Sequence, residues 1–265
     1  MSNFTLITGA SSGIGYEFAK IFAEHGHNLI LSARSKDVLN ELADELHKKH
    51  SVDVYVMPLD LTKPENSNDF QTFCEDRNIF LENIVNNAGF GDHEAFLYAD
   101  WKKLEDMMRL NMESLVRITH TFLPAMVNAK RGGILNVAST AAFQPGPFMA
   151  VYYATKSFVL SFSEAINEEL QGTGVHVTAL CPGPTLSGFQ KTANMDKAKI
   201  LQYLNMPTSR SVAEYGYKAF MNKKTVAIHG LGNKLMVQSL RISPRALILK
   251  ILRLLQGKER VSPQS

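Results

Sequence analysis

The chain has 265 residues, of which 45% are hydrophobic, and its formal net charge at pH 7 is only +3. A chain of this length can bury a sizeable core in one domain. Its basic residues are spread out except at the C-terminal end, which gives little support for a nucleic-acid-binding or acidic-membrane-binding surface. The two cysteines, Cys74 and Cys181, lie far apart without paired histidines nearby, which argues against a disulfide framework or a metal site. We therefore expect a small-molecule partner, no nucleic acid and no metal.

The N-terminal sequence also bears on where in the cell the protein is expected. Strand-like sequence begins within MSNFTLITGA, which leaves no room for a signal peptide. No stretch approaches the roughly 18 consecutive apolar residues that a membrane-spanning helix needs. We therefore expect a cytoplasmic protein.

Seven short apolar or β-branched runs alternate with helical patterns along the chain. The runs occupy residues 4–8, 28–33, 52–59, 83–88, 133–139, 175–181 and 225–230. They are continuous rather than alternating in polarity, as expected when helices cover both faces of a parallel sheet. The pattern predicts a doubly wound, Rossmann-type α/β fold with a seven-stranded parallel sheet. No linker or repeat divides the chain, so we expect a single domain over residues 1–265.

A glycine-rich turn, TGASSGIG, follows the first predicted strand and opens the first helix at residues 8–15. Such glycines permit a tight turn, let backbone N–H groups approach a pyrophosphate, and allow close packing of helix on strand. The position between strand and helix strengthens a motif that would be weak alone. The cofactor-binding candidates in this turn are Gly9, Ser11, Ser12, Gly13, Ile14 and Gly15.

The end of the second predicted strand, LSARSK, bears on the choice of dinucleotide. A carboxylate there commonly holds the adenosine ribose diol, but this chain has Ala33 and Arg34 instead. No carboxylate would repel a 2′-phosphate, and Arg34 can bind one with several N–H groups at once. The sequence therefore favours NADP(H) as the cofactor, with a solubilising surface role for Arg34 as the alternative.

The stretch VYYATK, residues 151–156, places two tyrosines before a lysine. With 3.6 residues per turn, Tyr152 lies about 40° and Tyr153 about 60° from Lys156 around a helix, so helix geometry favours neither strongly. Ser139 closes the fifth predicted strand and would bring a hydroxyl to the edge of the sheet where ligands of such folds bind.

With these motifs the chain resembles the short-chain dehydrogenase/reductase family, in its short, one-domain branch. The family pattern is a TGxxxGxG turn, an NNAG strand, an Asn in the next helix, a Ser thirteen residues before a Tyr, and YxxxK. This sequence has all of them in order over about residues 3–230: TGASSGIG, NNAG at 86–89, Asn111, Ser139, Tyr152, Lys156, and PGPT at 182–185.

The resemblance implies hydride transfer between a nicotinamide and a carbonyl/alcohol pair. Tyr152 would be the acid in reduction and the base in oxidation, with Lys156 nearby lowering the pKa of its phenol. Ser139 would donate to the substrate oxygen, and Asn111 would hold a water that connects Lys156 to solvent. Tyr153 is expected to point to a different helix face and to pack in the core or at a subunit contact.

Further cofactor contacts follow from the resemblance, position by position. Asp60 and Leu61 would bind the adenine, and the NNAG strand would pass close to the ribose. Tyr152 and Lys156 would contact the cofactor as well as the substrate. The remaining positions that the resemblance implies are Asn87, Ala88, Gly89, Pro182, Gly183 and Thr185.

Two segments stand apart from the regular alternation. Residues 186–208 form a long polar connection that could cover a ligand, or an ordinary exposed excursion. Residues 243–257 read as an amphipathic helix with basic flanks. This helix could seal the substrate pocket, pack on another subunit, or make a peripheral membrane contact, and packing within the protein or its oligomer is favoured.

The family forms dimers and tetramers, so a homodimer or homotetramer is expected. The substrate pocket is expected between residues 91–96, 143–148 and 186–208, which are rich in Phe, Met and Pro and suggest a moderately sized apolar substrate. An alternative is a catalytically silent NADP(H)-sensing or scaffold protein on the same fold. A sugar-nucleotide epimerase is less favoured, because the chain has no large C-terminal substrate domain.

Overall fold

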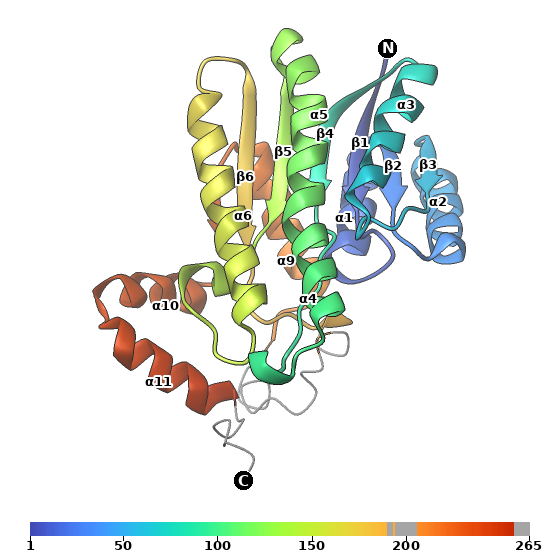
Figure 1. Ribbon diagram of the computed structural model, residues 1–265. Coiled ribbons are helices and arrows are strands. Elements are labelled where there is room, and N and C mark those ends of the chain that lie inside the picture. The colour runs from blue at the N-terminus through green and yellow to red at the C-terminus, as the bar shows by residue number, and fades with distance from the viewer. Residues whose placement is uncertain (190–192, 194–205, 257–265) are drawn as a thin grey trace.

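The computed structural model describes residues 1–189, 193 and 206–256. Seven strands form one parallel sheet in the order β3-β2-β1-β4-β5-β6-β7 (Figure 1). The strands are β1 (Ser2–Thr8), β2 (Asn28–Ser32), β3 (Val54–Met57), β4 (Ile79–Asn86), β5 (Gly132–Val137), β6 (Val175–Cys181) and β7 (Val226–Ile228). The predicted doubly wound, seven-stranded parallel sheet is confirmed.

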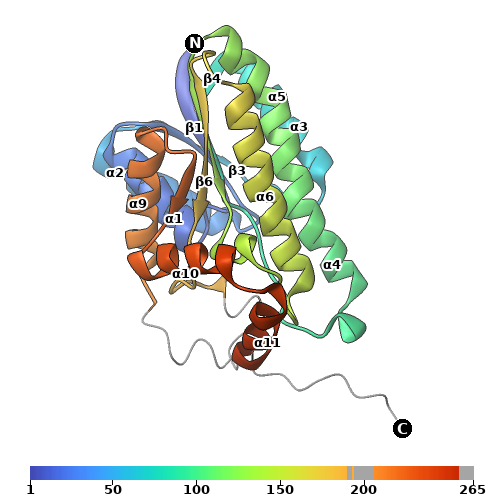
Figure 2. The same ribbon diagram turned by 90° about the vertical axis from the view of Figure 1, so that its left-hand side faces the viewer.

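Helices cover both faces of the sheet, as Figure 2 shows edge-on. One face carries α1 (Gly13–Glu24), α2 (Lys36–His50) and α9 (Ser209–Met221), and the other carries α3 (Asn68–Asp76), α5 (Leu115–Asn128) and α6 (Ala150–Glu169). Helix α4 (Trp101–Met108) continues through a π-helical turn, Arg109–Ser114, into α5. Short 3-10 turns lie at Pro64–Ser67, Phe96–Tyr98 and Thr140–Phe143. Two further helices, α10 (Leu231–Ile242) and α11 (Arg245–Gln256), follow the last strand.

The burial pattern follows the sequence periodicity that predicted these elements. In α2, Leu39, Leu42 and Leu46 recur at helical spacing and are all buried, while the intervening charged residues face solvent. Burying each leucine stabilises the fold by about 2 kcal/mol relative to leaving it exposed. In β1, five consecutive residues from Phe4 to Thr8 are buried, because helices cover both sides of this strand.

Several strand boundaries differ from those expected. β4 begins at Ile79 rather than 83, since the chain already pairs with the first residues of β1 there. β5 ends at Val137, so Ser139 lies two residues beyond it. The Ser139 hydroxyl accepts a hydrogen bond from the Ala141 N–H at 3.1 Å and caps the following 3-10 turn, which ends the strand. The C-terminal helix was placed correctly to within two residues, but α10 was not anticipated.

The sheet topology determines where a ligand can bind. The strand order reverses between β1 and β4, so the connections from these two strands leave in opposite directions. Such a switch point opens a crevice at the carboxyl ends of the strands. All seven strands are parallel, so their carboxyl ends share one edge, which lies at the bottom of Figure 1.

Candidate active site

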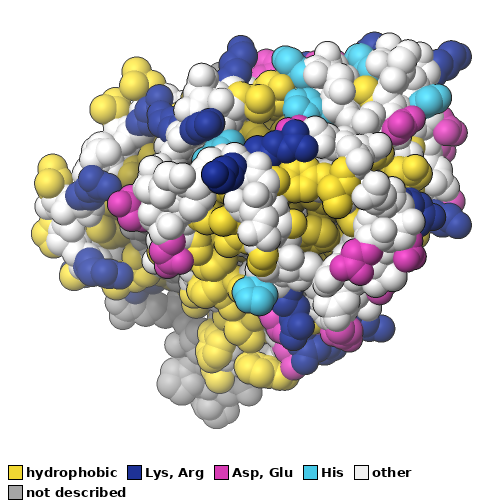
Figure 3. Space-filling model, turned by 90° about the horizontal axis from the view of Figure 1, so that it is seen from above, with side chains coloured by type: hydrophobic (Ala, Val, Ile, Leu, Met, Phe, Trp, Pro, Cys, Tyr) yellow, Lys and Arg dark blue, Asp and Glu magenta, His cyan; other side chains and the backbone are white. Residues whose placement is uncertain are grey.

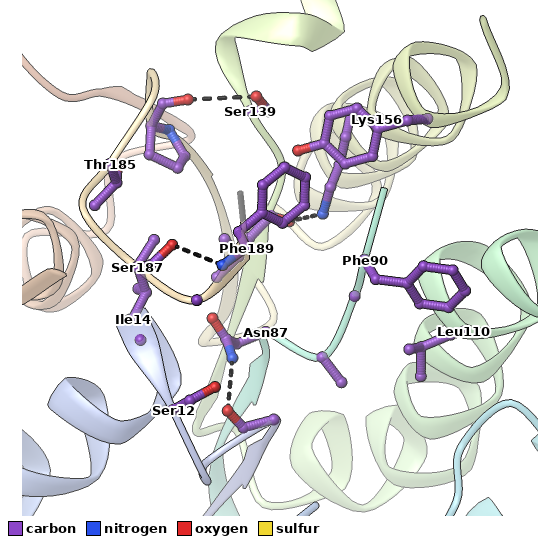
Figure 4. A pocket seen from close by; sticks show the side chains of 18 of the residues that line it. Ser12, Ile14, Asn87, Phe90, Leu110, Ser139, Lys156, Thr185, Ser187 and Phe189 are labelled. Carbon is purple, nitrogen blue, oxygen red and sulfur yellow. Dashed lines mark hydrogen bonds between the residues drawn. The ribbon is translucent and has the colours of Figure 1, made fainter. Parts of the chain in front are cut away.

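A cavity of about 560 Å³ lies at this edge of the sheet. Its volume falls in the ordinary range for small-molecule sites. All the predicted site residues line it except Gly15 and Asn111: Gly9, Ser11, Ser12, Gly13, Ile14, Arg34, Asp60, Leu61, Asn87, Ala88, Gly89, Ser139, Tyr152, Lys156, Pro182, Gly183 and Thr185. Figure 4 shows them converging from the ends of β1, β4 and β5, from α6 and from the loop after β6.

The glycine-rich turn forms the floor on one side of the cavity. Gly9 and Gly13 have φ angles of +68° and +58°, a region that side chains other than glycine rarely adopt. A Cβ atom on Gly9 would lie 2.8 Å from the Asn87 amide nitrogen. That amide donates to the Thr8 and Gly9 carbonyl oxygens at 3.0 and 3.2 Å and holds the turn against β4. Gly15 lies behind the turn, where a Cβ would overlap the Gly9 backbone.

The N-terminus of α1 opens into this floor. No side-chain hydrogen bond caps it at Ser12, and its first turn carries no acidic residue. The first N–H groups of a helix have no intrahelical partners, and the helix dipole favours negative charge beside them. This end of the cavity therefore suits a phosphate group.

A positive charge lies at the rim of the same end. Arg34 follows β2, is exposed, and makes no ion pair within 4 Å to any residue of the described chain. Burial would raise the pKa of Asp60, but hydrogen bonds from Thr62 and the nearby charge of Arg34 outweigh it and lower that pKa. The guanidinium is thus available to an anionic group of a ligand.

Ser139 and Lys156 lie at the opposite end of the cavity (Figure 4), and Tyr152 lies beside both of them. The Lys156 ammonium nitrogen donates to the Val137 carbonyl oxygen at 2.8 Å and lies 5.9 Å from the centre of the Tyr152 ring. The Ser139 hydroxyl donates a long hydrogen bond of 3.4 Å to the Pro182 carbonyl oxygen. This hydrogen bond is weak, so the Ser139 hydroxyl can donate to another acceptor instead.

The titration behaviour of Tyr152 differs from the expectation. Burial raises the pKa of its phenol well above the ordinary value, and interaction with the Ser139 hydroxyl opposes this only in part. Burial also lowers the pKa of Lys156 to about 8. The predicted lowering of the tyrosine pKa by the lysine is not found in this structure, because burial disfavours the charged forms of both groups. The Tyr152 phenol is therefore neutral near neutral pH, the form that can donate a proton.

Asn111 supports the site from behind. It is 2% exposed and lies in the π-helical turn. Its amide group donates to the Phe90 carbonyl oxygen and the Thr155 hydroxyl at 2.9 and 3.0 Å, and its oxygen accepts from the Phe90 N–H at 3.1 Å. A Cβ on Gly89 would lie 2.9 Å from the Asn111 oxygen and 3.5 Å from the Lys156 nitrogen. Asn111 thus fixes the backbone beside Lys156, and its role in holding a water stays a prediction.

The position of Tyr153 differs from the one predicted. It borders the same cavity as Tyr152, and its ring fills the space in which Gly146 would carry a Cβ. The two tyrosine rings meet edge to face, with centres 6.1 Å apart. Tyr153 thus lines the site, contrary to the expectation, and it also packs against the buried cluster around Met149, as the expected core contact requires.

The apolar wall of the cavity also differs from the expected one. Residues 91–96 and 143–148 do not line this cavity; several of them border a smaller hollow of about 30 Å³ beside it. Of the expected segment 186–208, residues 187–189 line the cavity, whereas 190–192 and 194–205 lie outside the described residues. The Phe189 ring packs on Tyr152 with centres 5.2 Å apart, and Met149 is buried beside them.

Sequence reasoning missed several residues of the wall. Met149, Phe90, Leu110 and Lys103 line the cavity without belonging to any motif, and Tyr153, inside the YxxxK motif, lines it although it was expected elsewhere. Met149 and Tyr153 flank Tyr152 closely in sequence, which was the available signal. Lys103 and Leu110 are brought in by α4 and the π-helical turn, and no local pattern marks them.

Comparisons with known proteins agree with this geometry. Residues 3–198 match the family model described as short chain dehydrogenase. A human very-long-chain 3-oxoacyl-CoA reductase is 30% identical over 69% of this chain and 59% of its own length. A sulfoacetaldehyde reductase 2 from Chromohalobacter salexigens is 36% identical over 71% of this chain and 75% of its own length. The chain spans little more than half the length of several curated relatives.

The fold is shared with solved structures. A short-chain dehydrogenase from Sphingobium yanoikuyae in complex with NADPH superposes with a TM-score of 0.82 at 30% identity. The match covers 94% of this chain and 95% of that protein. The likeness therefore includes the C-terminal part of the chain beyond the family match.

Proposed function

The chain belongs to the short-chain dehydrogenase family, and from this premise we propose that it is an NADP(H)-dependent oxidoreductase that interconverts a carbonyl group and a secondary alcohol. The observation that carries the proposal is the convergence of Ser139, Tyr152 and Lys156 on a cavity whose other end is the glycine-rich turn. A proton donor, a hydroxyl and a cation beside a dinucleotide-sized cavity are the groups that this reaction needs.

The cavity fits a phosphorylated dinucleotide. The positive φ angles at Gly9 and Gly13 and the uncapped start of α1 suit a pyrophosphate. Arg34, which has no ion-pair partner among the described residues, suits a 2′-phosphate, and Ala33 leaves no carboxylate to repel it. The Sphingobium relative was solved with NADPH, which supports the same choice.

The chain's own residues would supply positioning and a proton. The bound cofactor supplies the hydride in reduction. Ser139 would donate a hydrogen bond to the substrate oxygen, and Tyr152, neutral because of its raised pKa, would transfer its proton to that oxygen as negative charge develops. Lys156 would stabilise the resulting phenolate by its charge, and its pKa of about 8 lets it return a proton near neutral pH.

The cavity wall supports an apolar substrate of moderate size. Phe189, Met149 and Tyr153 gather around Tyr152 and offer aromatic and thioether surface rather than charge. The two curated relatives named above differ widely in substrate, from a very-long-chain 3-oxoacyl-CoA to sulfoacetaldehyde. For this reason the proposal rests on the wall and extends only to the substrate class.

The experiment is consumption of NADPH by the purified protein across a panel of apolar ketones and aldehydes. We expect turnover with apolar carbonyls, faster with NADPH than with NADH, and a loss of about a hundredfold in kcat in Ser139→Ala. Stoichiometric binding of NADPH without turnover of any carbonyl or alcohol would instead identify a catalytically silent cofactor sensor.

A further inference from the structure

Helices α10 and α11 have an unusual charge composition. Residues 231–256 contain five cations, Lys234, Arg241, Arg245, Lys250 and Arg253, and no acidic residue. No ion pair joins any of the five to a residue in the described part of the chain. This contrasts with the remainder of the protein, where acidic and basic residues nearly balance.

Helix α10 exposes a narrow apolar stripe. Leu231, Leu235 and Ile242 are 72%, 64% and 86% exposed, and at 100° per residue they fall within about 40° of one another. Val237 lies on the opposite side and is buried. Only one face of the helix packs on the protein, and a second, equally apolar face is left in solvent.

Helix α11 repeats the arrangement. Ile248 and Leu252, one turn apart, are buried and attach the helix to the protein. Leu247, Ile251 and Leu254 lie on an adjacent face at spacings of four and three and are 50%, 47% and 70% exposed. Packing within the chain thus uses part of the apolar surface of this helix and leaves a larger part exposed.

The two helices lie at the end of the molecule that contains the cavity. Figure 2 shows α10 running below the carboxyl edge of the sheet with α11 beyond it, and Figure 1 shows both helices on the side of β6 and α6. Asn233 of α10 packs against Gly183, where an added Cβ would approach its amide nitrogen to 2.6 Å. Figure 3 shows hydrophobic and basic side chains mixed along the left margin, the side on which these helices lie in Figure 1.

We propose that α10 and α11 dock the protein onto an anionic lipid surface. Apolar stripes flanked by cations that form no ion pair within the described chain match the acyl region and the negative headgroups of such a surface. A second copy fits less well, because a two-fold contact between these helices would bring the same cations together, and residues 231–256 offer no acidic partner on either side. No helix of the described chain is long and apolar enough to cross a bilayer, so the contact is peripheral.

The docked orientation has a consequence for the cavity. Since α10 contacts the Pro182–Gly183 loop and the 3-10 turn after Ser139, the lipid surface would lie beside the reacting end of the site. A lipid-dissolved apolar substrate could then reach the cavity without crossing bulk water.

The experiment is cosedimentation of the full chain with vesicles of phosphatidylcholine alone and of phosphatidylcholine mixed with anionic phosphatidylglycerol. We expect binding to the anionic vesicles only, weakened by salt. Arg241→Glu with Lys250→Glu is expected to weaken binding by more than about tenfold. The control, Lys48→Glu with Lys49→Glu on exposed positions of α2, lowers the net charge equally and is expected to retain binding.

A second pair of variants tests the apolar stripes. Leu235→Ser with Ile251→Ser is expected to weaken vesicle binding, whereas Val38→Ser with Met221→Ser, exposed apolar positions on α2 and α9, is not. Turnover of a small water-dissolved aldehyde in the Arg241 and Lys250 variant separates docking from catalysis and is expected to match wild type. Failure of the wild-type protein to cosediment with anionic vesicles would overturn the proposal. An equal loss of vesicle binding in the α2 control variant would also overturn it. So would a wild-type dimer that does not bind vesicles and that dissociates when Leu235 and Ile251 are changed.

Discussion

The glycine-rich side of the cavity and its apolar side are built from different parts of the chain. On the first side the surface is mostly backbone, formed by Gly9 and Gly13 at positive φ and by the start of α1, and the Asn87 side-chain amide ties it to β4. On the second side the surface is side chain, with Phe189 and Met149 packed around the tyrosines of α6.

This difference determines how far each side can vary. A backbone surface that has no room for a Cβ tolerates almost no substitution, so it holds one kind of ligand group. A side-chain surface can change by single substitutions while the fold persists. Local sequence motifs therefore identify the glycine-rich side, which is proposed to bind the cofactor. The apolar side, proposed to bind the substrate, depends on residues that belong to no motif.

Gly15→Ala tests the rigidity of the glycine-rich side and has the largest expected effect on stability. The added methyl group would overlap the Gly9 backbone, so the free energy of unfolding is expected to fall by about 3 kcal/mol or more. Urea denaturation measures it. Gly232→Ala, where no atom lies within 4 Å of the added Cβ and φ is ordinary, is the matched control and is expected to be nearly neutral.

Lys156→Met tests the cost of burying a charge at the reacting end. The lysine pKa is lowered from 10.5 to about 8, so its buried charge costs stability below pH 8, and the cost disappears as the pH rises toward 10.5. The stability of wild type relative to Lys156→Met is expected to rise by about 3 kcal/mol across this window. Urea denaturation of both proteins at several pH values measures the difference, and a flat or falling difference would contradict the lowered pKa.

Arg34→Ala tests the anionic end of the cavity. Loss of the guanidinium is expected to raise the Kd for NADPH by about tenfold to a hundredfold and to leave the Kd for NADH unchanged. Titration of both cofactors by fluorescence measures the ratio. Lys36→Ala removes an exposed cation two residues away that does not line the cavity, and it is expected to change neither value. A wild-type preference for NADH would refute the role of Arg34.

Phe189→Ala tests the apolar side and has the smallest expected effect. Removing the ring that packs on Tyr152 is expected to raise the KM for apolar ketones about fivefold, by loss of about 1 kcal/mol of apolar contact, with kcat nearly unchanged. Phe158→Ala is the control, because Phe158 is an exposed residue of α6 that stacks on Phe162 and does not line the cavity. A similar change in both variants would mean that Phe189 does not contact the substrate.

Much of the fold could be predicted because hydrophobic periodicity reports burial directly. The seven strands were found as continuous apolar runs, and α2 by its leucines at positions 39, 42 and 46. The ends of the strands were predicted less accurately. Ser139 lies outside its strand because its hydroxyl accepts from the Ala141 N–H and caps a turn. The polarity pattern of a sequence does not show which hydrogen-bonding partner such a side chain takes.

The apolar wall and the π-helical turn could not be predicted for a different reason. Asn111 is held by Phe90, 21 residues before it, and Thr155, 44 residues after it, so the local geometry depends on contacts distant in sequence. Phe148 and Phe189 are both aromatic residues of connections between strands and helices of the sheet, yet only Phe189 reaches the main cavity. Composition identifies apolar loops but does not say which of them fold inward.

The most direct test of the account compares the two adjacent tyrosines. Both tyrosines line the cavity and both precede Lys156 closely in the sequence, but only Tyr152 is proposed to donate the proton. The measurement is kcat for NADPH-dependent carbonyl reduction by Tyr152→Phe and Tyr153→Phe under identical conditions. The account predicts a loss of more than about a thousandfold for Tyr152→Phe and less than about fivefold for Tyr153→Phe. Equal losses in the two variants, or wild-type turnover by Tyr152→Phe, would contradict it.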